Sequence, residues 1–408
     1  MNIGFDASRS FIGKRTGTEN YSYQVLKHLA QLDHTNNYYI YLRPGAGLAL
    51  QGQTLQDWPV NFKFIIIPYP RLWTQFGLAL QTFKDPLDIL FIPAHTLPLI
   101  RKPGLKTVVT VHDLGAEYLP QTHQIKQRLY LSLMTHHQLK SATHLIAVSE
   151  STKKDLIAKI KIPEKKISVI YEGFNQELFA LVKDDVLNNV LREYDLVKNS
   201  YLLFVGTIQP RKNLERLIRA YKGYLVGGAQ ERSQVSTASR RTSGEDAPEI
   251  PKRQDPQVKS LNLVLAGSKG WLSDEIYQLP TKLGIEDDVK FLGYVPDKHL
   301  PALYSGAKAF LYPSLFEGFG LPILEAFSCG CPVLTSTTSS TPEVAGDAAI
   351  LVNPYSVDDI TRGIKQITND EKLTNQLVAK GFEQVKKFSW EKAAKETLQI
   401  LIDTVKNS

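Results

Sequence analysis

The feature that most constrains the fold is an alternation of short apolar strands with helical segments, which runs through both halves of the chain. The first half has seven candidate strands rich in β-branched and aromatic residues: Asn2–Asp6, Tyr38–Leu42, Lys63–Pro68, Asp88–Ile92, Lys106–His112, His144–Val148 and Ile167–Tyr171. The second half repeats the pattern: Tyr201–Gly206, Leu261–Ala266, Val289–Leu292, Ala307–Tyr312, Pro332–Thr335 and Ala348–Val352. Apolar strands separated by helices are typical of parallel sheets covered on both faces. We therefore predict an α/β fold with two doubly wound, Rossmann-like domains.

The length of 408 residues also favours two domains, since a single core rarely grows beyond about 250–300 residues. We expect an N-terminal domain over residues 1–180, a polar linker over 181–198 and a second domain over 199–388. A final helix over 389–408 carries one apolar stripe. Residues 227–259 are rich in Ser, Thr, Gln and Gly, and we interpret them as a mobile polar insertion.

Composition excludes several classes of protein. No apolar run approaches the 18 residues that a transmembrane helix needs, and residues 1–6 do not resemble a secretory signal. The two cysteines, Cys329 and Cys331, have the spacing of neither a disulfide framework nor a zinc site. We expect a cytoplasmic protein that has no resident metal or cofactor.

The positive charge is concentrated in the first half. Residues 1–180 hold 20 Lys and Arg against 13 Asp and Glu, an excess that accounts for the whole net charge of +7. This asymmetry is either incidental or the mark of an anionic partner, such as a phospholipid surface, a lipid phosphate or a nucleic acid. Mixed basic and apolar residues around Lys126 and Arg128 are compatible with peripheral membrane docking, although a half-buried helix has the same pattern.

The most informative segment is Tyr312–Phe327, which reads YPSLFEGFGLPILEAF. A strand ends at Tyr312, a glycine-containing loop follows, and Pro322 suits the first turn of a helix. The glycines allow a ligand to approach the backbone, and the first amides of the helix suit phosphate or sugar oxygens. Glu317 in the loop and Glu325, which we place in the first helical turn, can each accept two hydroxyl donors from a sugar or ribose. The alternative for Glu325 is a favourable interaction with the helix dipole.

A second segment, VGTIQPRKN over residues 205–213, also follows a strand and precedes a helix. Arg211 and Lys212 would bind a diphosphate there, Arg as a planar fork and Lys as a point charge. The alternative is a solvated basic turn. If the basic pair binds the diphosphate, Lys212→Ala should impair turnover and leave the fold intact.

The N-terminal half has weaker candidates. Gly17 and Thr18 begin a helix after the first strand and could present backbone amides to phosphate, although the segment does not match the dinucleotide fingerprint. His112 ends a strand next to Asp113, a position typical of functional loops in α/β sheets. His95 stands at another strand end.

Together these segments resemble the retaining glycosyltransferases of family 4, and bacterial mannosyl and hexosyl transferases of polysaccharide synthesis in particular. The resemblance rests on the two glutamates separated by seven residues, on VGTIQPRKN, and on shorter matches that follow the family order along nearly the whole chain. These are LVLAG over 263–267, VKFLG over 289–293, VSEST over 148–152, VIYEG over 169–173 and CGCP over 329–332. The resemblance implies the GT-B architecture, in which two Rossmann-like domains face each other.

The resemblance also implies roles for single residues. Glu317 would lie beside the donor sugar hydroxyls, and Glu325 would bind the ribose. Arg211 and Lys212 would neutralise the leaving diphosphate, and His112 would lie near the reacting carbon. Further residues would approach the donor with their backbone; they are Gly17, Thr18, Gly206, Gly318, Phe319, Gly320 and Leu321.

Two departures from the family pattern affect these assignments. Thr207 stands where many members carry Arg, so Arg211 is the candidate to supply that charge, and the insertion at 227–259 is longer than usual. The final helix is similar to the family crossover that packs back on the N-terminal domain.

The predicted reaction is a metal-independent transfer, with retention, of a hexose of mannose or glucose type from a GDP- or UDP-sugar. The acceptor is a glycan or a lipid-linked molecule, reached at the inner face of an anionic membrane, and no nucleic acid is involved. Two alternatives are an epimerase of sugar nucleotides with the same architecture, and a basic membrane- or nucleic-acid-binding protein with a relict donor site.

Overall fold

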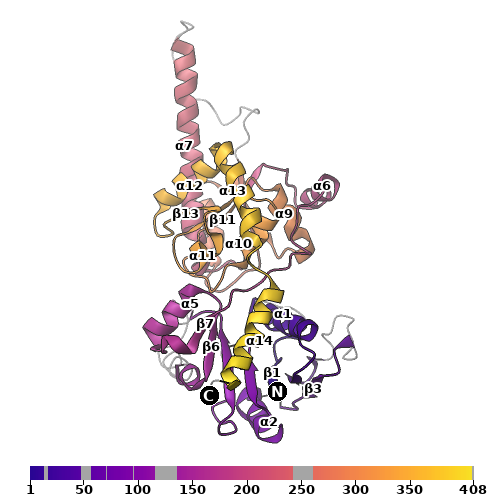
Figure 1. Ribbon diagram of the computed structural model, residues 1–408. Coiled ribbons are helices and arrows are strands. Elements are labelled where there is room, and N and C mark those ends of the chain that lie inside the picture. The colour runs from indigo at the N-terminus through magenta and orange to yellow at the C-terminus, as the bar shows by residue number, and fades with distance from the viewer. Residues whose placement is uncertain are drawn as a thin grey trace. The chain divides into compact units, whose positions relative to one another are not determined.

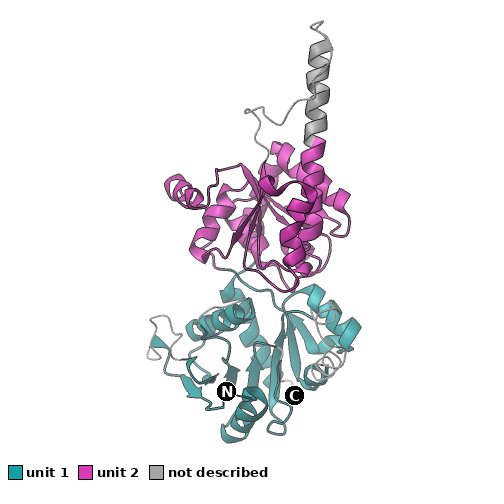
Figure 2. Ribbon diagram, turned by 180° about the vertical axis from the view of Figure 1, so that it is seen from behind, with its two compact units in different colours: residues 1–174, 388–408 teal, residues 175–387 magenta. Residues whose placement is uncertain are grey.

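The computed structural model describes residues 1–12, 17–46, 57–69, 71–94, 96–114, 136–241 and 261–406, with the backbone alone over 228–241. The described chain forms two compact units (Figures 1 and 2). Unit 1 comprises Met1–Phe174 and Phe388–Ser408, and unit 2 comprises Asn175–Lys387.

Unit 1 is built on a seven-stranded parallel sheet with strand order β3-β2-β1-β4-β5-β6-β7. Its strands are β1 (Asn2–Asp6), β2 (Asn37–Leu42), β3 (Phe62–Ile66), β4 (Ile89–Ile92), β5 (Lys106–Val111), β6 (His144–Ala147) and β7 (Ile167–Val169). Its helical elements are α1 (Gly17–Leu32), η3 (Trp73–Leu78), α2 (Ala79–Lys84), α5 (Glu150–Asp155), η5 (Leu156–Ile160), η6 (Glu164–Lys166) and α14 (Trp390–Lys406). Every residue of the central strand β4 is buried because helices cover both faces of the sheet.

Unit 2 contains a six-stranded parallel sheet with the order β10-β9-β8-β11-β12-β13. Its strands are β8 (Tyr201–Val205), β9 (Asn262–Ala266), β10 (Val289–Gly293), β11 (Ala309–Tyr312), β12 (Val333–Ser336) and β13 (Ala349–Val352). The longer helices are α6 (Asp184–Glu193), α7 (Leu214–Arg241), α8 (Asp274–Leu283), α12 (Val357–Asn369) and α13 (Glu371–Val385). Shorter elements are η7 (Pro210–Lys212), η8 (Glu286–Asp288), η9 (Asp297–His299), α9 (Leu300–Gly306), α10 (Leu321–Ser328) and α11 (Thr341–Ala345). The prediction of two doubly wound parallel sheets is confirmed.

The final helix belongs to unit 1, because its first residues pack tightly against the segment that follows β7. A side chain at Gly173 would overlap the backbone of Trp390, so only glycine allows this approach. The indole of Trp390 packs edge-on against the ring of Tyr21 in α1, with centroids 5.9 Å apart. The C-terminal helix thereby completes the core of the N-terminal unit.

The boundary between the units lies earlier than the predicted linker. Residues from Asn175 onward belong to unit 2, including helix α6, where the sequence led us to expect a polar connector. The reason is that α6 packs on α9 through buried Leu187 and Leu191, and Asn199 N donates to the Gly306 carbonyl oxygen at 2.7 Å.

The predicted insertion at 227–259 is partly helical. Residues 227–241 continue helix α7, and residues 242–259 lie outside the described residues. A run of helix-compatible residues after Gly228 extends the helix that the apolar first turns begin.

Candidate active site

The strands β8 and β11 lie side by side in the middle of the unit 2 sheet, although they are far apart in the sequence. The strand order reverses at this point, with β9 and β10 on one side and β12 and β13 on the other. The crevice outside the carboxyl ends of such strands is the usual ligand site of open α/β sheets. Both segments singled out in the sequence, 205–213 and 312–327, follow these two strands.

The loop after β8 leaves the sheet through a glycine that no other residue could replace without strain. Gly206 has φ +147° and packs against Gly267, where a side chain would collide with the Gly206 carbonyl oxygen. Asn213 ends the loop in the left-handed region, and its Nδ2 donates to the carbonyl oxygens of Pro313 and Pro354 at 3.0 and 2.6 Å. These contacts hold η7, and therefore its two cations, against the loop after β11.

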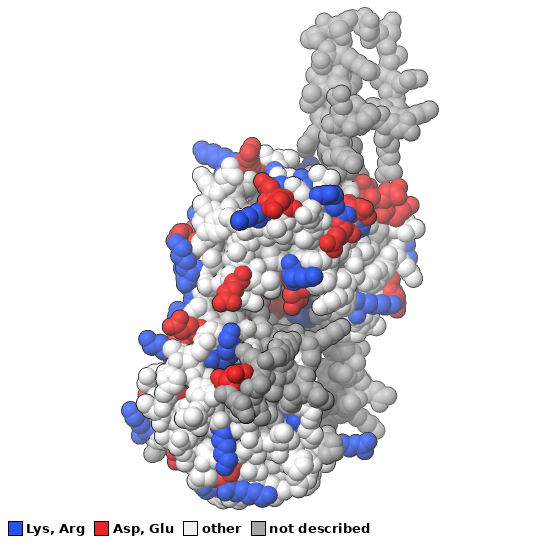
Figure 3. Space-filling view, turned by 90° about the vertical axis from the view of Figure 1, so that its right-hand side faces the viewer, with Lys and Arg blue, Asp and Glu red and all other residues white. Residues whose placement is uncertain are grey.

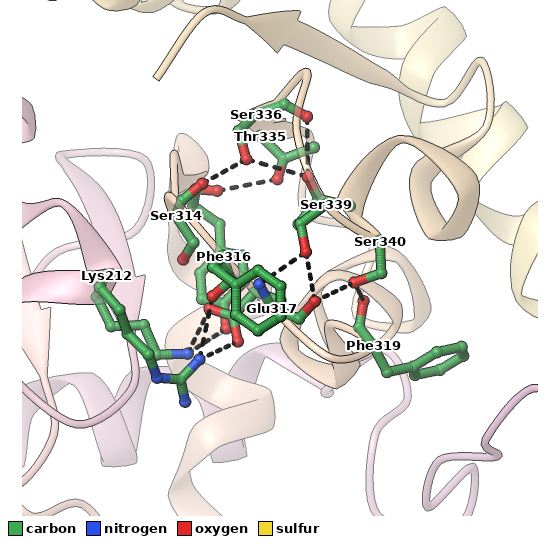
Figure 4. A network of polar contacts seen from close by, with 12 residues as sticks. Lys212, Ser314, Phe316, Glu317, Phe319, Thr335, Ser336, Ser339 and Ser340 are labelled. Atoms are coloured by element: carbon green, nitrogen blue, oxygen red, sulfur yellow. Dashed lines mark hydrogen bonds and ion pairs between the residues drawn. The ribbon is translucent and has the colours of Figure 1, made fainter. Parts of the chain in front are cut away.

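Arg211 and Lys212 both bind the carboxylate of Glu317, and Figure 4 shows Lys212 directed toward Glu317. Lys212 Nζ donates to Glu317 Oε1 at 2.6 Å, and Arg211 Nη1 donates to Oε2 at 2.7 Å. Lys212 Nζ also donates to the Tyr312 hydroxyl at 2.6 Å. We call these four residues the cation–carboxylate cluster. It contains two positive charges and one negative charge, so it has an excess of one positive charge.

The two cations differ in their access to solvent. The Lys212 side chain is 7% exposed, like that of Glu317, whereas the Arg211 side chain is 27% exposed. The solvated basic turn considered from the sequence therefore does not exist at Lys212. A variant without this buried ammonium would leave Tyr312 and Glu317 each with one partner fewer, so we expect Lys212→Ala to lower stability as well as turnover.

The charges of the cluster keep Glu317 ionised. Burial alone would raise the pKa of Glu317, but the charges of Lys212 and Arg211 outweigh it and lower the pKa to about 2. A carboxylate with this pKa accepts hydrogen bonds at every physiological pH and does not serve as a proton donor.

Two serines after β12 fasten the backbone of Glu317. Ser339 Oγ accepts from Glu317 N at 3.0 Å and donates to the Glu317 carbonyl oxygen. Ser340 Oγ donates to the carbonyl oxygens of Glu317 and Phe319 at 3.0 and 2.6 Å (Figure 4). Ser339 itself has φ +61°, a conformation that a serine adopts at some cost. The sequence analysis did not identify these residues, and adjacent serines after a strand are too common to single them out.

The glycine loop ends at Gly320, which has φ +116° and precedes the first residue of α10. Pro322 stands in the first turn as expected, and its ring costs no hydrogen bond there. Phe319 and Gly320 are buried, whereas Gly318 and Leu321 are half-buried at the same end of the helix. The amides of this first turn lie at the N-terminal end of α10, the end of a helix that suits an anion.

Glu325 lies in the second turn of α10 and not, as we expected, in the first, because the helix begins at Leu321. Its side chain therefore cannot act chiefly on the helix dipole, an effect that is confined to the first turn. Burial raises the pKa of Glu325 to about 7, and the hydrogen bond from the Tyr304 hydroxyl at 3.1 Å offsets only part of this shift.

In unit 1, His112 follows β5 and is buried with both ring nitrogens engaged. Nδ1 lies 2.9 Å from Glu172 Oε1, and Nε2 lies 2.9 Å from the Pro93 carbonyl oxygen. Because a carbonyl only accepts, Nε2 carries a proton. Burial disfavours the imidazolium, but the hydrogen bond and charge of Glu172 outweigh it and raise the pKa of His112 above its ordinary value. His112 and Glu172 thus form a buried hydrogen-bonded pair in which the carboxylate favours the charged form of the imidazole.

Glu172 is a further residue of the candidate site that the sequence did not single out. It stands in the segment VIYEG, which contributed to the resemblance, but only the tertiary structure brings the loop after β7 to the end of β5. Tyr21 completes the surroundings of the imidazole, with ring centroids 4.7 Å apart.

The remaining candidates have fewer described contacts. Gly17 and Thr18 are the first two residues of α1, and Gly17 is exposed with open space around its Cα. Residues 13–16, His95 and the basic helical stretch around Lys126 and Arg128 lie outside the described residues.

Three further observations concern metals, cysteines and membranes. Among the described residues there is no group of three or more His, Cys, Asp or Glu side chains arranged to hold a metal ion.

Cys329 and Cys331 are buried free thiols at the end of α10, where their side chains pack in the core of unit 2. None of the helices in the described ranges is long and apolar enough to cross a membrane.

Comparison with known proteins gives two family matches that together span most of the chain. Residues 15–178 match the model for Glycosyltransferase Family 4, and residues 245–384 match that for Glycosyl transferases group 1. The chain is 33% identical over 293 residues to O-antigen chain mannosyltransferase B of Escherichia coli, covering 72% of this chain and 69% of that protein. The chain belongs to the family 4 glycosyltransferases.

A second relative and a solved structure extend this comparison. The serotype-specific mannosyltransferase WbdA of Escherichia coli is 30% identical over 74% of this chain, but the match spans only 33% of WbdA. Sucrose-phosphate synthase from Thermosynechococcus elongatus has a similar structure, with a TM-score of 0.71, 19% identity and full coverage of both chains. At this identity the likeness shows the fold alone, and it agrees with the GT-B architecture of this glycosyltransferase. The family assignment favours a transferase over the epimerase and the relict binding protein.

Proposed function

We propose that this glycosyltransferase transfers a hexosyl group of mannose or glucose type from a GDP- or UDP-sugar to a hydroxyl of a glycan or lipid-linked acceptor during polysaccharide synthesis. The observation that carries the proposal is the cation–carboxylate cluster at the ends of β8 and β11, whose excess positive charge suits a diphosphate. The 33% sequence identity to an O-antigen chain mannosyltransferase supports the proposed type of sugar and the proposed class of acceptor.

The donor would bind along the loops of unit 2. Arg211, the more exposed of the two cations, has the planar fork that matches a phosphate. The amides of Gly320 and Leu321, at the N-terminal end of α10, are further donors for phosphate oxygens. The ionised Glu317 would accept hydrogen bonds from sugar hydroxyls. Glu325, one turn further, would bind the vicinal hydroxyls of the ribose.

The leaving group would serve as the base. The bond from the anomeric carbon to the diphosphate oxygen breaks, the acceptor oxygen forms the new bond on the same face, and its proton passes to the departing phosphate oxygen. Arg211 and Lys212 stabilise the charge that develops on the diphosphate, a task that this pair can perform without a metal ion. Attack on the face that the leaving group vacates gives retention of configuration.

His112 fits a positioning role in this scheme better than that of a general base. Its Nε2 is bound to the Pro93 carbonyl oxygen and its Nδ1 to Glu172, so proton abstraction would require both bonds to break. The buried pair would fix the loops after β4, β5 and β7, on the acceptor side of the reaction.

The test is calorimetric binding of GDP- and UDP-sugars in the presence of a chelator, followed by NMR of the product formed from the bound donor. We expect one nucleotide to bind, and the product to keep the anomeric configuration of the donor. An inverted product would overturn the mechanism, and failure of every donor to bind would overturn the donor site.

The pH dependence of binding sharpens this test. Since the pKa of Glu325 is about 7, donor binding should strengthen as the pH rises from 6 to 8 and the carboxylate forms. Glu325→Gln should bind the donor about tenfold more weakly at pH 8 and lose this pH dependence. An unchanged pH profile in the variant would remove Glu325 from the ribose site.

A further inference from the structure

The outer face of η3 and α2 in unit 1 is apolar where a surface helix is normally polar. Leu72, Phe76, Leu80 and Phe83 follow one another at helical spacing, and their exposed fractions lie between 45% and 65%. Single exposed apolar residues are ordinary, but a continuous row along a helix marks a surface that meets a partner.

The row is not a product of poorly packed helices. The opposite face, formed by residues such as Trp73, Leu78 and Ala79, is buried in the core of unit 1. The helices are therefore anchored by one apolar face while they present another to solvent. Figure 1 shows α2 at the lower edge of unit 1 in that view.

A loop lies alongside and widens the row. Gln75 Nε2 donates to the Leu97 carbonyl oxygen, and Leu99 N donates to Gln75 Oε1. Lys102 N donates to Thr82 Oγ1 at 3.0 Å, which holds the far end of the loop against α2. Ile100, which is 73% exposed, lies between these two anchor points. We call the five exposed side chains the apolar ridge; they are Leu72, Phe76, Leu80, Phe83 and Ile100.

Basic side chains border the apolar ridge. Arg71 and Lys84 are exposed at its two ends, and Lys102 is half-buried beside it. Asp85, which follows Lys84 in the chain, is bound by the Tyr41 hydroxyl and by Gln81 Nε2, both at 2.8 Å. Figure 3 shows basic side chains, with fewer acidic ones, along the lower edge of unit 1.

We propose that the apolar ridge docks this enzyme on an anionic phospholipid surface. A single helical face of aliphatic and aromatic side chains, bordered by cations, is the pattern by which interfacial helices enter the headgroup region. A protein partner would more commonly meet a polar rim with charges of both signs. The ridge is made of other residues than the stretch around Lys126 and Arg128, which was considered from the sequence for the same purpose and lies outside the described residues.

The test is sedimentation of the full chain with vesicles of phosphatidylglycerol and phosphatidylcholine, compared with vesicles of phosphatidylcholine alone. We expect binding to the anionic vesicles that weakens as salt is added. Phe76→Gln combined with Phe83→Gln should weaken it about 30- to 100-fold, because each half-exposed aromatic side chain that becomes buried contributes about a factor of five to ten to the partition. Arg71→Gln with Lys84→Gln should weaken it about fivefold per residue on anionic vesicles only.

A matched control is the pair Val186→Gln and Val197→Gln in unit 2, which removes exposed apolar side chains away from the ridge and should leave vesicle binding unchanged. Wild-type protein that stays in solution, or a ridge variant that still binds, would overturn the proposal. So would loss of self-association or of thermal stability in the ridge variant without loss of vesicle binding, since the ridge would then pack against protein. Vesicle binding does not depend on donor binding, so the two proposals fail separately.

Discussion

Each unit has a buried glutamate in a loop that follows its strands, but the two units neutralise the carboxylate differently. In unit 2, Glu317 is bound by Arg211 and Lys212, so the cluster keeps one surplus positive charge. In unit 1, the partner of Glu172 among the described residues is His112, and the pair is neutral overall when both partners are charged. The first arrangement suits a diphosphate, and the second suits holding loops in place.

The partners also give the two clusters opposite responses to pH. Glu317 has a pKa below its ordinary value, so its contribution to folding is complete above about pH 4.5 and is lost as the pH falls toward 2. His112 has a pKa above its ordinary value, so its contribution is complete at low pH and is lost as the pH rises through that raised pKa. Variants of each cluster can therefore be distinguished by the direction in which pH affects them.

The largest effect is expected from Lys212→Met, which removes the surplus charge. Turnover at saturating donor should fall at least about 100-fold, because the diphosphate loses one stabilising charge as it leaves. Stability should also fall by about 3 kcal/mol because Glu317 and Tyr312 lose a buried partner. Steady-state kinetics and urea unfolding measure the two effects. Lys212→Arg keeps the charge and should recover part of the turnover, and normal turnover by Lys212→Met would sink the assignment of the cluster.

The second-largest effect tests how the stability contributed by Glu317 responds to acid. Glu317→Gln should lower the free energy of unfolding at pH 7 by about 3 kcal/mol, the value that corresponds to a pKa near 2 instead of 4.5. The difference between variant and wild type should shrink as the pH falls toward 2, since the wild-type carboxylate then becomes protonated. Urea unfolding at pH 7 and at pH 3 makes the measurement; equal differences at the two values would contradict it.

Glu172→Gln tests how the stability contributed by His112 responds to rising pH. Loss of the carboxylate should lower the pKa of His112 and cost about 2 kcal/mol of stability near neutral pH. The cost should decrease as the pH rises and the wild-type imidazolium also loses its proton. Titration of the His112 ring signals by NMR, with His144 as an internal reference, checks the pKa. An unchanged titration of His112 would show that the pair carries no charge.

The smallest effect concerns the serine that holds Glu317. Ser339→Ala should cost about 1 kcal/mol of stability and raise the KM for donor more than it lowers kcat, because it loosens the backbone of Glu317. Ser339→Gly also removes the hydroxyl but relieves the left-handed backbone, so it should be less destabilised than Ser339→Ala. If both variants keep the wild-type KM and stability, Ser339 has no positioning role.

Much of the fold followed from local patterns. The expected strands all correspond to strands of the two sheets, because an apolar run of four to six residues between helices has few other ways to bury itself. Ser149, a residue type that commonly caps helices, caps α5 with its Oγ accepting from Thr152 N at 3.0 Å. Boundaries were less accurate: α6 packs into unit 2, and α10 begins late enough to place Glu325 in its second turn.

The site was only partly visible in the sequence. Arg211, Lys212 and Glu317 were recognisable because strand, glycine and helix signals surround them, and a parallel sheet brings strand ends together. Their mutual ion pairs, the burial of Lys212 and the serines after β12 depend on which strands are neighbours. The same holds for Glu172, which lies 60 residues from His112 in the chain.

The sequence by itself determined the two parallel sheets, the loops with the charged residues and the family, since these depend on periodicity and on short motifs. Only the tertiary structure decided which charges meet, which are buried, and that the row from Leu72 to Phe83 faces solvent. The physical reason is that pairing, burial and pKa depend on distances between segments that sequence spacing does not encode. Because β8 lies next to β11 in the sheet, Lys212 and Tyr312, which are 100 positions apart in the chain, belong to one cluster.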